Sequence, residues 1–158
     1  MTFSIVGTGN IAWFLGTRLV TAGHDCVGIY SRNITAAQSL AEALLSKSYG
    51  AVTDIKDGVA DVCFLAVSDT AITQAASLLS FKQTVLVHTA GAVALDEIKI
   101  AANDRAVFWP VYSILRHNLP VHRNIPCAWE ASSKKAECIF SWSDPFLIIN
   151  LPPKSKNL

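Results

Sequence analysis

The sequence predicts an α/β domain with a doubly wound, mainly parallel sheet that carries helices on both faces. Short apolar runs alternate with helical patterns along the first 110 residues, which is typical of strand–helix–strand units with right-handed crossovers. The runs are continuously apolar, as expected for strands that are buried on both faces. With 51% hydrophobic and only 16% charged residues, the composition fits either such a sheet or a chain that normally covers itself with a partner.

The first strand–helix unit lies at the start of the chain. An apolar run over residues 3–6 predicts a strand that ends at Gly7. Apolar residues at helical spacing over 10–22 predict a helix, which Gly23 ends as a C-terminal cap.

Further elements follow the same alternation. Strands are expected at 26–30, 50–52, 61–67, 84–88 and 105–109, and helices at 35–46, 70–79 and 95–102. After residue 110 the pattern changes. One more helix is expected at 132–140, and residues 143–158 contain three prolines and have no clear period.

Composition and charge exclude several classes of function. The 158 residues include 13 Lys or Arg and 12 Asp or Glu, a net charge of +1, without a basic cluster. No nucleic-acid or acidic-membrane surface is therefore expected. No apolar run approaches the roughly 20 residues of a membrane span, and no signal peptide is expected. The four cysteines lack metal-binding spacing, so we expect no metal site and a cytoplasmic location.

A glycine-rich turn joins the first strand to the first helix. It reads G-T-G-N-I-A and comprises Gly7, Thr8, Gly9, Asn10, Ile11 and Ala12. In a dinucleotide site, Gly7 would make the tight turn, Gly9 would let a pyrophosphate approach the backbone, and Ala12 would let helix and strand pack closely. The anion would rest on the N–H groups at the helix N-terminus. The alternative is a turn whose glycines serve only backbone freedom.

The end of the second strand indicates which dinucleotide would bind. NAD sites place an acidic residue there for the ribose hydroxyls, whereas this chain has Ser31, Arg32 and Asn33 and no acid between Asp25 and Glu42. A guanidinium and a hydroxyl suit a 2′-phosphate, so NADP is the expected cofactor. The alternative for Arg32 is a charge that simply faces solvent.

Two further strand ends meet at the same edge of a parallel sheet. Val67, Ser68 and Asp69 follow one strand, and His88, Thr89 and Ala90 follow the next, so all six are expected near the cofactor. Asp69 or Thr70 is also expected to be a helix N-cap. His88 is a candidate for proton transfer, although a histidine at a strand end is more often structural.

These stretches together resemble a known family. The segments VGTGNIA, YSR, LAVSD, HTAG and PVYS are similar to those of Rossmann-like oxidoreductases related to pyrroline-5-carboxylate reductase, deazaflavin-dependent NADP reductases and 6-phosphogluconate dehydrogenase. The likeness is narrowest to a bacterial branch with an uncharacterised helical C-terminal domain, and it extends from Met1 to about Ala136.

The resemblance implies an NADP-binding domain over residues 1–131 and a second, helical domain that completes the cleft and usually a homodimer. Residues 132–158 are expected to be a short helix and an irregular tail, a remnant of that second domain. The implied function is hydride transfer between NADP(H) and a small-molecule substrate. The catalytic residues stay unassigned, with His88 and Ser113 as candidates.

Two other functions are consistent with the sequence. The missing second domain, and the absence of a convincing acid–base pair, would also fit an NADP-binding module or sensor without catalytic activity. A flavodoxin-like or other α/β domain with structural glycines is the third reading.

Overall fold

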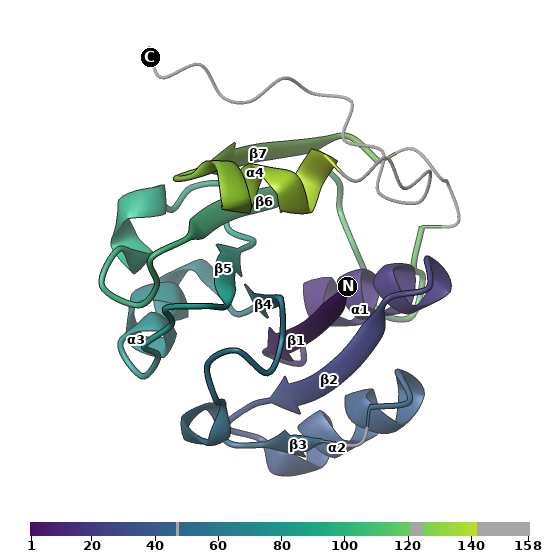
Figure 1. Cartoon of the computed structure of the whole chain (residues 1–158). Coiled ribbons are helices and arrows are strands. Elements are labelled where there is room, and N and C mark those ends of the chain that lie inside the picture. Colours follow the sequence, from purple (N-terminus) through teal and green to yellow (C-terminus); the bar gives the residue numbers. More distant parts are fainter. Residues whose placement is uncertain (47, 121–124, 142–158) are drawn as a thin grey trace.

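The sheet is seven-stranded in the part of the chain that the computed structural model describes, residues 1–46, 48–120 and 125–141 (Figure 1). The strand order is β3-β2-β1-β4-β5-β6-β7. All neighbouring pairs are parallel except β6 and β7, which are antiparallel. The first six strands follow the Rossmann order, which confirms the predicted fold class. The strands are Thr2–Val6 (β1), Asp25–Tyr30 (β2), Tyr49–Gly50 (β3), Val62–Leu65 (β4), Val85–His88 (β5), Arg105–Pro110 (β6) and Cys127–Ala131 (β7).

Most of the strands are joined by helical segments, which differ in length. The α-helices are Asn10–Thr21 (α1), Ile34–Ala43 (α2), Ile72–Ala76 (α3) and Lys134–Ser141 (α4). Short 3₁₀ helices are Val52–Asp54 (η1), Asp69–Ala71 (η2) and Leu95–Ile98 (η3). Helix α1 ends as expected, because Gly23 has a φ of +86° and its N–H donates to the Val20 carbonyl at 3.0 Å.

Several predicted elements were wrong in part. Only Tyr49 and Gly50 pair in the sheet, and Val52 begins η1 instead of ending a strand. The helix expected at 70–79 is divided into η2 and the short α3, and the one expected at 95–102 is only η3. Neither Asp69 nor Thr70 is the N-cap of α3, which is Ala71. Strand β7 was not predicted, and residues 142–158, which include the expected tail, lie outside the described residues.

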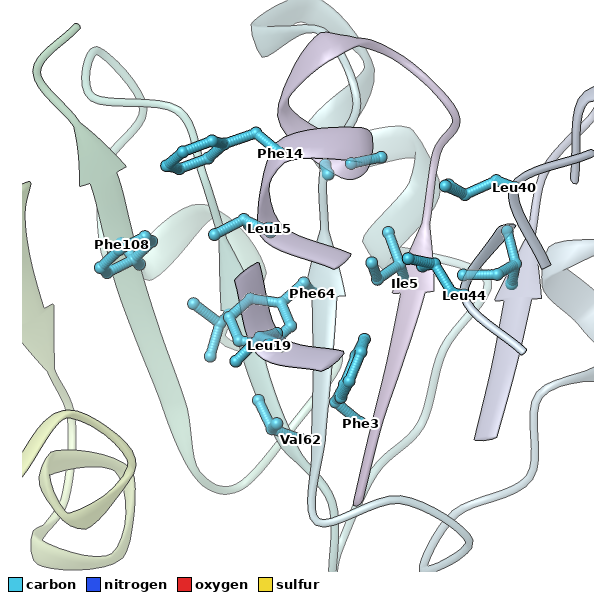
Figure 2. Close-up of a cluster of buried hydrophobic side chains, with 14 of the residues drawn as sticks. Phe3, Ile5, Phe14, Leu15, Leu19, Leu40, Leu44, Val62, Phe64 and Phe108 are labelled. Atoms are coloured by element: carbon cyan, nitrogen blue, oxygen red, sulfur yellow. The ribbon is translucent and has the colours of Figure 1, made fainter. Parts of the chain in front are cut away.

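Two apolar clusters cover the two faces of the sheet. Ile5, Phe64 and Val87 belong to the cluster under α1 and α2, whereas Val6 and Leu65 belong to the cluster with α3 and η3. Figure 2 shows Phe14, Leu15 and Leu19 of α1 facing side chains of β1, β4 and β6. Successive strand residues point to opposite faces, so burial of both faces explains the continuous apolar runs.

No helix in the described ranges combines the length and the apolarity that crossing a membrane would require.

Candidate dinucleotide-binding site

Gly7 makes the tight turn between β1 and α1. Its φ is +113°, and a Cβ at this position would lie 2.2 Å from the Ala66 carbonyl oxygen. The Gly7 N–H donates to the Tyr30 carbonyl at 2.8 Å, which ties the turn to the end of β2. A side chain would therefore be strained and would collide with the backbone next to β4. Ala12 is fully buried in the cluster under α1, as its predicted packing role requires.

Gly9 leaves open space at the N-terminus of α1. It is the N-cap residue, has no side chain to cap the helix, and a Cβ built on it would meet nothing within 4 Å. The first turn of α1 contains no acidic residue. The first N–H groups of a helix have no intrahelical acceptor and lie at the positive end of its dipole. This end of α1 is therefore suited to an anion.

An open pocket of about 350 Å³ lies over this turn. It brings together residues from the ends of β1, β2 and β4, at the carboxyl edge of the sheet. Its lining is Gly7, Thr8, Gly9, Asn10, Ile11, Ser31, Arg32, Ala66, Val67, Ser68 and Ala71. Ala66 and Ala71 were not predicted to line the site. Both lie within two residues of the predicted segment 67–69, and this proximity was the signal that could have found them.

At the end of β2, Ser31 and Arg32 line the pocket but Asn33 does not. The Ser31 N–H donates to the Gly50 carbonyl at 2.9 Å, and the Asn33 N–H donates to Ser31 Oγ at 3.1 Å. Asn33 caps α2, because its Oδ1 accepts from the Ala36 N–H at 3.0 Å. Arg32 is exposed, and no described residue forms a hydrogen bond or ion pair with its guanidinium.

The remaining predicted residues are not on the lining of the pocket. Asp69 is exposed in η2. His88 is fully buried at the end of β5, and its Nδ1 accepts from the Ala90 N–H at 3.3 Å. Thr89 is buried as well, with Oγ1 donating to the Leu65 carbonyl at 3.3 Å. Ser113 is exposed in the loop after β6.

One contact at this edge of the sheet had no signal in the sequence. The Arg116 main-chain N–H donates to Asn10 Oδ1 at 3.0 Å, across 106 positions of the chain. The loop after β6 therefore touches the glycine turn.

A family of known proteins matches more than half of the chain. The family model described as NADP oxidoreductase, coenzyme F420-dependent, matches residues 2–91. No curated protein matches the chain.

Several solved structures share this fold, and their chains are longer than this one. A Bacteroides fragilis protein proposed to be an NADP oxidoreductase is 22% identical with a TM-score of 0.80, over 94% of this chain and 58% of its own. A Thermotoga maritima protein is 28% identical with a TM-score of 0.67, over 87% and 51%. A pyrroline-5-carboxylate reductase from Streptococcus pyogenes is 16% identical with a TM-score of 0.72, over 92% and 56%. The chain thus spans only 51–58% of the length of these structures.

Proposed function

This chain belongs to the family of coenzyme F420-dependent NADP oxidoreductases, and from that premise we propose that it binds NADP(H) and serves hydride transfer to or from a small-molecule substrate. The observation that carries the proposal is the open N-terminus of α1 at Gly9, with Arg32 on the lining of the same pocket. The nicotinamide would supply the hydride chemistry, and the protein would bind and orient the nicotinamide.

Each part of the pocket has a proposed role. The N–H groups of residues 9–11 would bind the pyrophosphate, and Ser31 and Arg32 would bind the 2′-phosphate. Val67 and Ser68, at the end of β4, would line the path toward the nicotinamide. The choice of NADP over NAD rests on Arg32, because its exposed guanidinium can offer a fork of donors to a phosphate and no acid stands at the end of β2.

A second candidate function has its own support. Among the described residues that line the pocket, Arg32 alone has an ionisable side chain, and His88 is fully buried and not on the lining. The described residues thus offer no acid–base pair in the pocket, which favours a binding module or sensor without catalytic activity. Turnover of NADPH with a panel of imines, ketones and acids separates the two functions.

Titration with NADPH and NADH tests the proposal. We expect wild type to bind NADPH more tightly, and Arg32→Ala to weaken NADPH about tenfold while leaving NADH nearly unchanged, since a hydrogen bond to a charged group contributes about 1.5 kcal/mol. Lys99→Ala removes an exposed cation that is not on the lining and is the control. Equal losses for both nucleotides would contradict the 2′-phosphate role of Arg32, and no binding of either would refute the proposed function.

We also propose that two copies of this chain associate. The family resemblance favours a homodimer, and sedimentation equilibrium of the protein with and without NADPH measures it.

A further inference from the structure

The loop after β6 contacts the first turn of α1. Beyond the bond from the Arg116 N–H to Asn10 Oδ1, the Arg116 guanidinium carbon lies 4.0 Å from the centre of the Trp13 ring. Ile114 of the same loop is buried in the cluster under α1. Asn10 and Trp13 are three residues apart and share one face of the helix. The loop therefore packs against the face of α1 that carries Asn10 and Trp13, next to the glycine turn.

The bond to Arg116 fixes the orientation of the Asn10 carboxamide. A main-chain N–H can only donate, so the Asn10 atom that receives it must be the oxygen, and the Nδ2 amide lies at the other end of the group. Asn10 is exposed and lines the pocket. No hydrogen bond from Nδ2 to another described residue is found, so both of its hydrogens are available to a ligand.

This orientation matters for an anion at the N-terminus of α1. Phosphate oxygens accept hydrogen bonds and repel a carbonyl oxygen, so the carboxamide helps only when its Nδ2 end faces them. An Asn side chain without the Arg116 contact would sample both orientations and would lose rotational freedom on binding.

We propose that Arg116 is a positioning residue of the dinucleotide site, which it serves by holding the Asn10 carboxamide with its amide end toward the pyrophosphate. The main-chain N–H of Arg116 sets the orientation, and its guanidinium holds the loop against Trp13. In this arrangement Asn10 contacts the ligand and Arg116 acts through Asn10. The inference rests on the proposed binding of NADP(H).

Asn10→Asp tests the orientation with an isosteric change. The carboxylate can still accept from the Arg116 N–H, and an acid in the first turn of a helix is favourable, so we expect an unchanged or higher Tm. Its second oxygen would face the pyrophosphate, so the Kd for NADPH should rise at least about tenfold, more than in Asn10→Ala. Asn103→Asp is the control. It adds the same charge just before the amino end of β6, whereas the pocket lies at the carboxyl ends of the strands. A purely structural Asn10 would give the opposite order, with Asn10→Ala worse than Asn10→Asp.

Arg116→Ala tests the coupling through Asn10. Loss of the contact with Trp13 should weaken NADPH binding about two- to fivefold, the effect of an exposed cation–π contact, and Arg116→Lys should restore part of it. The double variant Asn10→Ala/Arg116→Ala should bind no more weakly than Asn10→Ala alone. Additive losses would show that Arg116 acts directly on the anion and would overturn the proposal.

The same titrations separate this inference from the function on which it rests. If wild type does not bind NADPH, the proposed function fails and the inference with it. If wild type and Asn10→Asp bind NADPH equally well, the positioning role alone is overturned.

Discussion

Only Thr8 separates Gly7 from Gly9, yet a methyl group added to each glycine would meet very different surroundings. At Gly7 it would lie 2.2 Å from the Ala66 carbonyl oxygen, at a φ of +113°. At Gly9 it would meet nothing within 4 Å. We therefore expect Gly7→Ala to lower the free energy of unfolding by about 2 kcal/mol or more, and Gly9→Ala to leave it nearly unchanged. Urea denaturation measures both.

Titration with NADPH tests the proposed role of Gly9 in binding. The methyl group of Gly9→Ala would occupy the space proposed for the pyrophosphate, so the Kd for NADPH should rise at least about tenfold in a protein of normal stability. A Gly9→Ala variant that binds NADPH like wild type would place the pyrophosphate elsewhere.

The cysteines differ in the state of their thiols. Burial raises the pKa of Cys63 to about 12, against a smaller lowering by a hydrogen bond with Ser4. Burial also raises the pKa of Cys127 to about 12, although the charge of Arg18 lowers it in part. The thiolate is the reactive form, so at pH 8 only about one in 10⁴ of these thiols is reactive. Cys138 is exposed.

Alkylation followed by peptide mapping should show this difference. We expect Cys138 to be modified first at pH 8, and Cys63 and Cys127 to be modified only when guanidinium unfolds the protein. Modification of Cys63 in the native protein at the rate of Cys138 would mean that the interior opens far more often than its burial implies.

At the scale of elements, Asp57 organises the turn before β5. Its carboxylate accepts from the main-chain N–H groups of Lys82 at 2.8 Å, Gln83 at 3.1 Å and Thr84 at 2.9 Å. Partial burial would raise the pKa of this carboxyl, but the hydrogen bonds from Thr84, Lys82 and Gln83 hold it below its ordinary value of 3.8. The charged form is thus the one that the folded protein stabilises.

The stability that Asp57 provides should therefore depend on pH. A folded pKa below the unfolded value gives stability that is fully present above pH 3.8 and is lost as the pH falls through the folded pKa. We expect Asp57→Asn to lower the free energy of unfolding by about 1 kcal/mol at pH 7. The difference from wild type, measured by urea denaturation, should shrink below pH 3.8. A constant difference down to pH 2.5 would show that the charge of Asp57 contributes nothing.

Strands were predictable where burial on both faces of the sheet requires a continuous run of apolar residues. The strands β4 and β5 are buried throughout and β1 is buried from Phe3 onward, and their apolar runs predicted them. Strand β7, with the sequence CAWEA, is largely half-buried and antiparallel at the edge, so it lacks such a run. Leu95 and Ile98 are buried three residues apart, a spacing that one 3₁₀ turn satisfies as well as an α-helix does.

The pocket was predictable for a related reason. Parallel strands end at one edge, so the residues after β1, β2 and β4 meet there whatever the loops do. The contact of Arg116 with Asn10 depends on the course of the loop after β6, and no local pattern specifies that course. His88 was placed correctly at the end of β5, but only the structure shows its burial.

At the scale of the whole molecule, β6, β7 and α4 form one lateral edge of the sheet, and none of their described residues is on the lining of the pocket. In the sheet order, β4 and β5 separate β6 from β1 (Figure 1). Phe140 packs α4 against this edge. The centre of its ring lies 5.8 Å from that of Phe108 in β6 and 5.3 Å from that of Trp129 in β7, and both pairs are stacked. Phe140 also packs against the apolar cluster under α1, whereas the lining of the pocket comes from the turns after β1, β2 and β4.

Phe140→Ala should separate stability from binding. Phe140 is half-buried, so loss of its ring should lower the free energy of unfolding by about 1–3 kcal/mol. The Kd for NADPH should stay the same, and saturating NADPH should then raise the stability of variant and wild type by the same amount. Urea denaturation with and without NADPH measures both quantities. A smaller gain in the variant would mean that the edge and the pocket are coupled through the sheet, because a ligand stabilises a variant less only when the variant binds it more weakly.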